Sequence, residues 1–188
     1  MEKIASFTID HTKLKHGIYV SRVDKIAKYN ITTFDIRVKQ PNVEEPMTPA
    51  CAHTIEHLGA TFFRNNTQWK DKVIYFGPMG CLTGFYLILK GTYTPGTTTY
   101  ESVVEFIMSM FSYVVRFEGK IPGATRVECG NYKMNDLEAA QWLAANMLTM
   151  YETFDSLSYE YPGHETTTLY KKALAKFKDE HPKSNVLF

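Results

Sequence analysis

Two stretches near the N-terminus alternate apolar and polar side chains, and this alternation constrains the fold more than any other feature of the chain. Residues 17–23 and 33–39 both follow it, with Tyr29 and Asn30 near the expected turn between them. A period of two is typical of strands with one buried face, and two such strands joined by a turn predict an antiparallel hairpin. The buried face of this hairpin requires a covering layer from elsewhere in the chain.

The remaining segments predict two more strands and three helices. Helix starts are indicated by Thr48 followed by Pro49, and by Thr98 paired with Glu101 in a capping box. The expected elements are a helix over 49–65, strands over 73–76 and 84–93, and helices over 98–118 and 136–153. The apolar faces of the last two helices suit packing on a sheet. We therefore predict an α+β fold, an antiparallel β-sheet packed against helices, in a single domain over residues 1–160.

Composition argues against several classes of protein. Twenty-one Lys and Arg against 20 Asp and Glu give a net charge of +1, which does not point to a nucleic-acid partner. The longest apolar run, Phe85 to Leu89, is far shorter than the ~20 residues that cross a bilayer. Three widely spaced cysteines do not suggest a disulfide framework. We expect a cytoplasmic protein without membrane association, ending in a lysine-rich C-terminal extension over residues 161–188.

The segment 53–57 carries the clearest chemical signal. His53 and His57 are four positions apart in the predicted helix, so both imidazoles lie on one face, close enough to hold one cation. Glu56 lies at the edge of that face and can act as a base. The order H-x-x-E-H is the inverted zincin pattern. The pattern predicts a metal site that needs a third protein ligand from elsewhere in the chain.

The three cysteines differ in their surroundings. Cys129 precedes Gly130, where the backbone can approach closely, and is the best candidate for the third ligand, with a buried structural cysteine as the alternative. A thiolate with two imidazoles suits Zn²⁺ or Fe²⁺. Cys81 lies in a glycine-rich turn, and a nearby dication would make it a general acid or base near neutral pH. Cys51 points away from the ligand face and is interpreted as a packing residue.

Taken together, these residues resemble the LuxS family of S-ribosylhomocysteine lyases. The resemblance covers most of positions 4 to about 153, and the order and spacing of its segments are highly specific. The matching segments are Ser6–Phe7, Asp10–Thr12, Phe34–Arg37, Gln40–Asn42, His53–Leu58, Pro78–Cys81, Thr83–Tyr86, Ile121–Pro122, Cys129–Gly130 and Leu137–Ala139.

The resemblance implies a LuxS/MPP-like metallohydrolase fold and a homodimer with its two active sites at the subunit interface. It implies one Fe²⁺ per subunit, with Zn²⁺ or Co²⁺ as substitutes, held by His53, His57 and Cys129. It also implies that Glu56 and Cys81 are the catalytic residues that move protons.

The same resemblance implies a substrate and a reaction. Residues matching Ser6, His11 and Arg37 help to hold S-ribosylhomocysteine. The thioether is cleaved to homocysteine and 4,5-dihydroxy-2,3-pentanedione, the precursor of the autoinducer-2 quorum signal. Carbonyl migration along the ribose followed by β-elimination accounts for this cleavage without a redox cofactor.

Two differences from the family pattern fall near the predicted site. The family usually has Asp-Ile-Ser before the Pro-Met-Gly-Cys turn, whereas this chain has Tyr75–Phe76–Gly77. Leu82 replaces the polar residue that usually follows the catalytic cysteine. Two other functions are therefore weighed. One is an inverzincin-like metallopeptidase or other hydrolase, and the other is a catalytically inactive metal-binding homologue.

Overall fold

The computed structural model describes residues 9–152. Within this range the elements are strands β1 (Gly17–Ile26) and β2 (Tyr29–Arg37), helix α1 (Pro49–Asn65), strands β3 (Val73–Pro78) and β4 (Gly84–Lys90), and helices α2 (Thr98–Val115) and α3 (Leu137–Glu152). The α+β prediction is confirmed. Ser6 and the C-terminal extension lie outside the described residues.

The four strands form one antiparallel sheet in the order β1-β2-β4-β3. The predicted hairpin is present but longer, since pairing runs from Gly17 opposite Arg37 to Ile26 opposite Tyr29. Tyr29 therefore lies in a strand, and the turn consists of the two residues before it. The first of these, Ala27, has a φ of 53°, as two-residue hairpin turns require.

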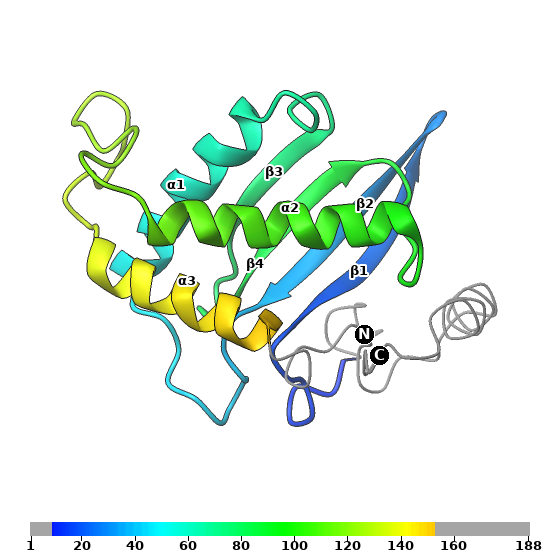
Figure 1. Cartoon of the computed structure of the whole chain (residues 1–188), viewed down its shortest axis with the longest axis horizontal. Helices are drawn as coiled ribbons and strands as arrows, with labels where there is room; N and C mark the ends of the chain where they lie inside the picture. The colour runs from blue at the N-terminus through cyan, green and yellow to red at the C-terminus, as the bar shows by residue number, and fades with distance from the viewer. Residues whose placement is uncertain (1–8, 153–188) are drawn as a thin grey trace, which may run out of the picture.

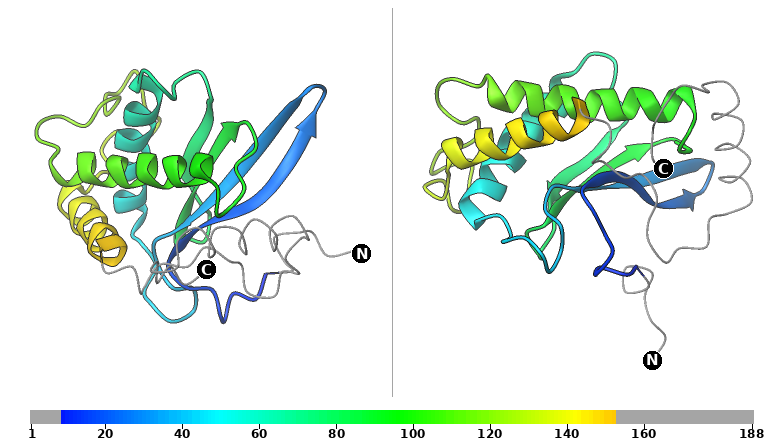
Figure 2. Two further views of the ribbon diagram at one scale, coloured as in Figure 1. Left: turned by 45° about the vertical axis from the view of Figure 1, so that its right-hand side comes forward. Right: turned by 60° about the horizontal axis from the view of Figure 1, so that its bottom comes forward.

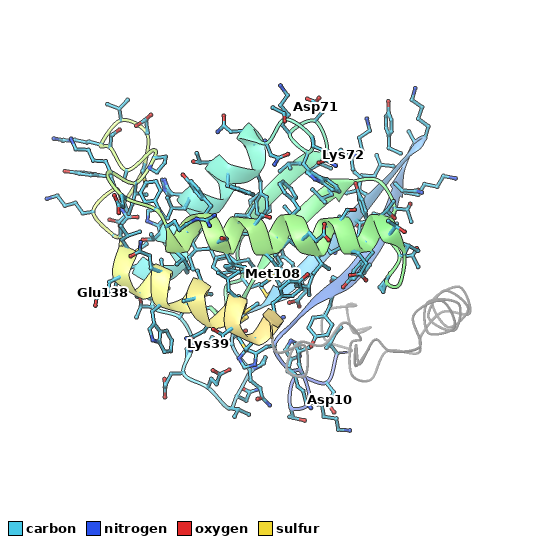
Figure 3. All side chains as sticks on the ribbon, viewed as in Figure 1. Asp10, Lys39, Asp71, Lys72, Met108 and Glu138 are labelled. Carbon is cyan, nitrogen blue, oxygen red and sulfur yellow. The ribbon has the colours of Figure 1, made fainter. Side chains whose placement is uncertain are left out.

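All three helices cover one face of this sheet. Helix α2 crosses the strands with α3 alongside it, and α1 packs beside β3 (Figure 1). The turned view shows the helices as one layer above the strands (Figure 2). Phe34 and Ile36 of β2 and Val103 and Ile107 of α2 are fully buried in the shared core. Met108 is buried where α2 passes α3 (Figure 3). No helix within residues 9–152 has the length and apolarity needed to span a membrane.

Threonine side chains cap the N-termini of α1 and α2, and the cap of α2 lies one residue earlier than predicted. The Thr48 side chain accepts a hydrogen bond from the Cys51 backbone N–H at 3.1 Å, as predicted for α1. The predicted cap of α2, Thr98, is wrong: Thr97 is the cap, and its hydroxyl accepts from the Tyr100 N–H at 3.3 Å. Thr97 has extended backbone angles, whereas Thr98 is already helical.

One large apolar side chain of α3 lies outside the core. Trp142 is 63% exposed. The Lys39 ammonium lies 5.4 Å from the Trp142 ring centroid, and Figure 3 shows Lys39 beside α3. A cation over the indole face stabilises this exposed position.

Close packing of α1 on β3 depends on Gly59. A Cβ at this position would lie 2.4 Å from Cε1 of Phe76, a ring that is itself held between Phe63 and Phe85. Because that ring cannot move aside freely, α1 must keep a glycine here despite its low helix propensity.

The Gly59→Ala variant should destabilise the fold by about 1–3 kcal/mol, because overpacking outweighs the gain in helix propensity. Urea unfolding followed by circular dichroism measures this effect. Gly80→Ala is the matched control, since a Cβ there meets nothing within 4 Å. Equal unfolding midpoints for the two variants would contradict the packing argument.

Candidate metal centre and active site

Helix α1 presents two imidazole rings on one face. His53 and His57 are one turn apart, and their Nε2 atoms lie 3.0 Å from each other. The ring centroids are 4.5 Å apart and the rings are nearly perpendicular, at 84°. Both side chains are half-buried. The helical spacing read from the sequence therefore brings two ring nitrogens to one point.

Two backbone carbonyls hold these rings in orientation. Nδ1 of His53 lies 2.7 Å from the Met134 carbonyl oxygen, and Nδ1 of His57 lies 2.7 Å from the Pro122 carbonyl oxygen. A carbonyl oxygen only accepts, so each Nδ1 must be the donor. In a neutral ring this leaves a lone pair on Nε2. Both carbonyls belong to residues 116–136, the segment between α2 and α3.

The same segment supplies a sulfur. Cys129 is half-buried, and its Sγ lies 3.3 Å from Nε2 of His53. Its backbone N–H donates to the Thr125 carbonyl at 3.0 Å, which fixes the turn that carries it. His53, His57 and Cys129 offer ligand atoms that all lie within 4.8 Å of one another. They form the one such group of three among the described residues.

The arrangement of these three atoms fits a transition metal. Metal bonds of about 2.0–2.3 Å in a tetrahedral site place neighbouring ligand atoms about 3–4 Å apart. The distances of 3.0 Å between the two Nε2 atoms and 3.3 Å from Nε2 of His53 to Sγ of Cys129 fall in this range. The two Nε2 lone pairs, 3.0 Å apart, repel each other unless a positive charge lies between them. Imidazole and thiolate ligands suit Zn²⁺ or Fe²⁺ and disfavour Mg²⁺ or Ca²⁺. Three protein ligands leave a fourth position for substrate.

Glu56 lies on α1 between the two histidines and faces β3. Its Oε1 would be 3.2 Å from a Cβ placed on Gly77. Its side chain is half-buried. Its carboxylate is therefore held against the strand that leads into the Cys81 turn.

The predicted reactive thiol lies in the turn between β3 and β4. Cys81 is exposed, and the turn is closed by a 2.9 Å hydrogen bond from the Leu82 N–H to the Met79 carbonyl. Leu82 has a φ of 56°, an uncommon conformation for a residue with a branched side chain. Sγ of Cys81 lies 3.1 Å from the Thr83 hydroxyl oxygen and 3.7 Å from Nη1 of Arg37.

These neighbours change the acidity of the thiol. Burial raises the pKa of Cys81, but the hydrogen bonds with Thr83 and the positive charge of Arg37 outweigh it, so the net pKa lies below the usual thiol value. In contrast, burial raises the pKa of Cys51 to about 11. The interpretation of Cys51 as a packing residue agrees with its burial.

A buried carboxylate positions the guanidinium beside Cys81. Asp35 binds Arg37 through two hydrogen bonds, and both side chains are almost fully buried. Arg37 also donates to the Thr83 hydroxyl at 2.6 Å. Sequence reasoning missed Asp35 and Thr83. Asp35 could have been found from its i, i+2 spacing to Arg37, which places both side chains on one face of β2.

The described contacts do not bring His11 to this cluster. Nδ1 of His11 lies 2.9 Å from the Ile9 carbonyl oxygen within its own segment. Ser6 is outside the described residues. The structure therefore joins the three expected metal ligands in one group, and Arg37 with Cys81 in another.

Comparison with known proteins identifies the family. Residues 4–156 match the sequence model of the family described as S-Ribosylhomocysteinase (LuxS). The chain belongs to the LuxS family. Several LuxS relatives bear the name S-ribosylhomocysteine lyase. One from Desulfotalea psychrophila is 54% identical over 158 residues, which cover 84% of this chain and 95% of that protein.

Two further relatives with the same name show similar coverage. The protein from Borreliella afzelii is 48% identical over 162 residues, 86% of this chain and all of that protein. The protein from Clostridium acetobutylicum is 46% identical over 162 residues, 86% of this chain and 99% of that protein. The LuxS match thus includes both the metal-ligand group and the Cys81 turn.

Thr83→Val should raise the pKa of the Cys81 thiol, because the variant removes the hydroxyl that stabilises the thiolate. The pH profile of Cys81 alkylation by iodoacetamide should move to higher pH, with modification at pH 7 slowed roughly threefold or more. Peptide mass spectrometry quantifies the Cys81 adduct. Thr83→Ser keeps the hydroxyl and should retain the wild-type profile. Identical profiles for the Val and Ser variants would refute the role of this hydrogen bond.

Removal of the metal with a chelator should loosen residues 116–136, because the carbonyls that orient both ligand histidines come from this segment. Hydrogen exchange read by mass spectrometry should become faster there, and slow again when Zn²⁺ is added. The centre of α2, whose buried side chains belong to the hydrophobic core, serves as the internal control. Unchanged exchange in the segment would contradict the coupling.

Proposed function

We propose that this protein is a metal-dependent S-ribosylhomocysteine lyase. It cleaves the thioether of S-ribosylhomocysteine to homocysteine and 4,5-dihydroxy-2,3-pentanedione, the precursor of autoinducer-2. The observation that carries this proposal is the convergence of His53, His57 and Cys129 in a chain of the LuxS family. The finer classification as a LuxS/MPP-like metallohydrolase fold belongs to the same proposal.

His53, His57 and Cys129 would hold one Fe²⁺ per subunit, with Zn²⁺ or Co²⁺ as substitutes. When bound, the metal supplies Lewis acidity, which polarises sugar oxygens and acidifies the adjacent C–H bonds. The chain's own contribution at this position is orientation. The carbonyls of Met134 and Pro122 fix both ring tautomers, so that the Nε2 atoms stay directed at one point.

Cys81 serves as the first proton shuttle. Its Sγ is exposed and its lowered pKa keeps a larger share of the side chain as thiolate near neutral pH. A thiolate can remove a proton from the hydroxyl-bearing carbon next to the carbonyl and return it to the former carbonyl carbon. With the hydroxyl proton passing to the former carbonyl oxygen, this moves the carbonyl along the sugar by one carbon. Arg37 and Thr83 stabilise the deprotonated form between these transfers.

Glu56 carries out the later proton transfers. Once the carbonyl reaches C3, removal of a proton from C4 allows the sulfur at C5 to leave as the thiolate of homocysteine, which is a β-elimination. A carboxylate on the helix that carries both metal ligands is suited to this step, because acidified C–H bonds lie close to the metal.

The proposal includes further assignments from the LuxS resemblance. Ser6, His11 and Arg37 help to hold the substrate. The protein works as a cytoplasmic homodimer with its active sites at the subunit interface, and takes part in quorum sensing through autoinducer-2. The closeness of Arg37 to Cys81 supports placing substrate next to the thiol.

A metallopeptidase or other hydrolase is the competing function. Such an enzyme would need the metal, a bound water and Glu56, but no second proton-transfer group. The cluster of Arg37, Thr83 and Cys81, with its lowered thiol pKa, favours the lyase because carbonyl migration uses two such groups.

Cys81→Ala should lower the turnover of S-ribosylhomocysteine by about 10²–10⁴-fold, the usual contribution of one acid–base group. Homocysteine release is measured chromatographically with anaerobically purified protein, and metal content by mass spectrometry. Metal content should stay normal, since Cys81 is not a ligand. Cys51→Ala is the control and should keep wild-type turnover. Metal loss equal to the loss of turnover would defeat the assignment.

A further inference from the structure

Tyr75 and Gly77, which both differ from the family pattern, form one structural unit on β3. Positions two apart in a strand share a face. A Cβ on Gly77 would lie only 2.0 Å from the Tyr75 hydroxyl oxygen and 2.6 Å from its Cζ. The tyrosine therefore folds over Gly77 and fills the space that any larger residue there would need. The two differences are one coupled change, because the tyrosine adopts this position only beside a glycine.

The same unit lies next to the proposed acid–base group, Glu56. The Cβ position of Gly77 lies 3.2 Å from Oε1 of Glu56, so the hydroxyl and the carboxylate oxygen approach one point from two elements. Burial raises the pKa of Tyr75, and the charge of Glu56 raises it further, so the phenol keeps its proton at neutral pH. A protonated phenol is a hydrogen-bond donor.

Neither group has a hydrogen-bond partner within residues 9–152. The structure gives the half-buried carboxylate of Glu56 no hydrogen bond or ion pair in this range, and the Tyr75 hydroxyl none either. The Tyr75 hydroxyl, a donor, thus lies near the Glu56 carboxylate, an acceptor, and neither is used in another hydrogen bond within this range. Tyr75 is 42% exposed, so part of its side chain is open to solvent.

We propose that Tyr75 is a positioning residue of the active site: its hydroxyl, in the space left by Gly77, directs the Glu56 carboxylate toward the substrate carbon. The inference rests on the proposed lyase function. An acid–base carboxylate without a hydrogen bond samples several rotamers, and a hydroxyl donor limits it to one. Tyr75 acts through Glu56, so its loss changes the proton-transfer step more than substrate binding.

The test compares three variants of the full-length, metal-loaded enzyme with S-ribosylhomocysteine. Tyr75→Phe should lower kcat by about 10-fold or more, the usual effect of losing a group that orients an active-site residue, while KM changes less than twofold and metal content is unchanged. Gly77→Ala should cause a similar loss, because its Cβ displaces the hydroxyl. Tyr29→Phe is the matched control, since Tyr29 is 44% exposed at the far end of the hairpin, and it should behave as wild type.

The double variant Tyr75→Phe/Gly77→Ala should lose no more activity than either single variant, because both changes remove the same interaction. A raised KM with unchanged kcat in Tyr75→Phe would overturn the inference by assigning the hydroxyl to substrate binding. Unchanged kcat and KM would overturn it by assigning Tyr75 a packing role alone.

A second measurement is independent of turnover. With tyrosine labelled by ¹³C at Cζ, the Tyr75 resonance is assigned by its loss in Tyr75→Phe and titrated in wild type and in Glu56→Gln. The phenol pKa should fall when the carboxylate charge is removed. An unchanged phenol pKa overturns the inference even if the wild-type enzyme is active. If the wild type releases no homocysteine while the pKa falls, the lyase function fails and the contact between the two residues stands.

Discussion

Two imidazole nitrogens that both carry lone pairs, held 3.0 Å apart, are the constraint on which the site depends. The carbonyls of Met134 and Pro122 take the Nδ1 protons of the two rings, so neither Nε2 carries a proton that could bridge the gap while the rings are neutral. A cation resolves this repulsion, and the sulfur of Cys129 completes a ligand set for it. The start of α1 at Thr48 and its packing on β3 at Gly59 keep the rings in place.

Residues 116–136 join this centre to the rest of the fold. The segment contains no helix or strand, yet it supplies Cys129 of the group that can hold a metal and both orienting carbonyls. A metal bound there would stabilise the segment, because a site formed only in the folded chain adds its binding free energy to folding. The sheet supplies the second cluster of the site, Arg37 beside Cys81. Buried Asp35 holds Arg37 beside Cys81 from the strand next to the turn.

Local patterns in the sequence predict much of this arrangement. Alternation predicts the hairpin, and the spacing of His53 and His57 predicts one helix face, because both follow from backbone geometry alone. What depends on tertiary contact could not be predicted. The sequence suggested only a nearby dication as a cause of a lowered Cys81 pKa, whereas Arg37 and Thr83 lower it through tertiary contacts. The fold of Tyr75 over Gly77 depends on a missing Cβ, which no periodicity reveals.

X-ray absorption spectroscopy at the metal edge, on protein purified anaerobically with its native metal, tests the central claim most directly. One metal ion per chain should be present, and its coordination shell should fit two nitrogen ligands and one sulfur ligand, with one or two further oxygens. The sulfur contribution should disappear in Cys129→Ser and remain in Cys81→Ser. A native site without sulfur, or one whose sulfur is lost with Cys81, would contradict the account.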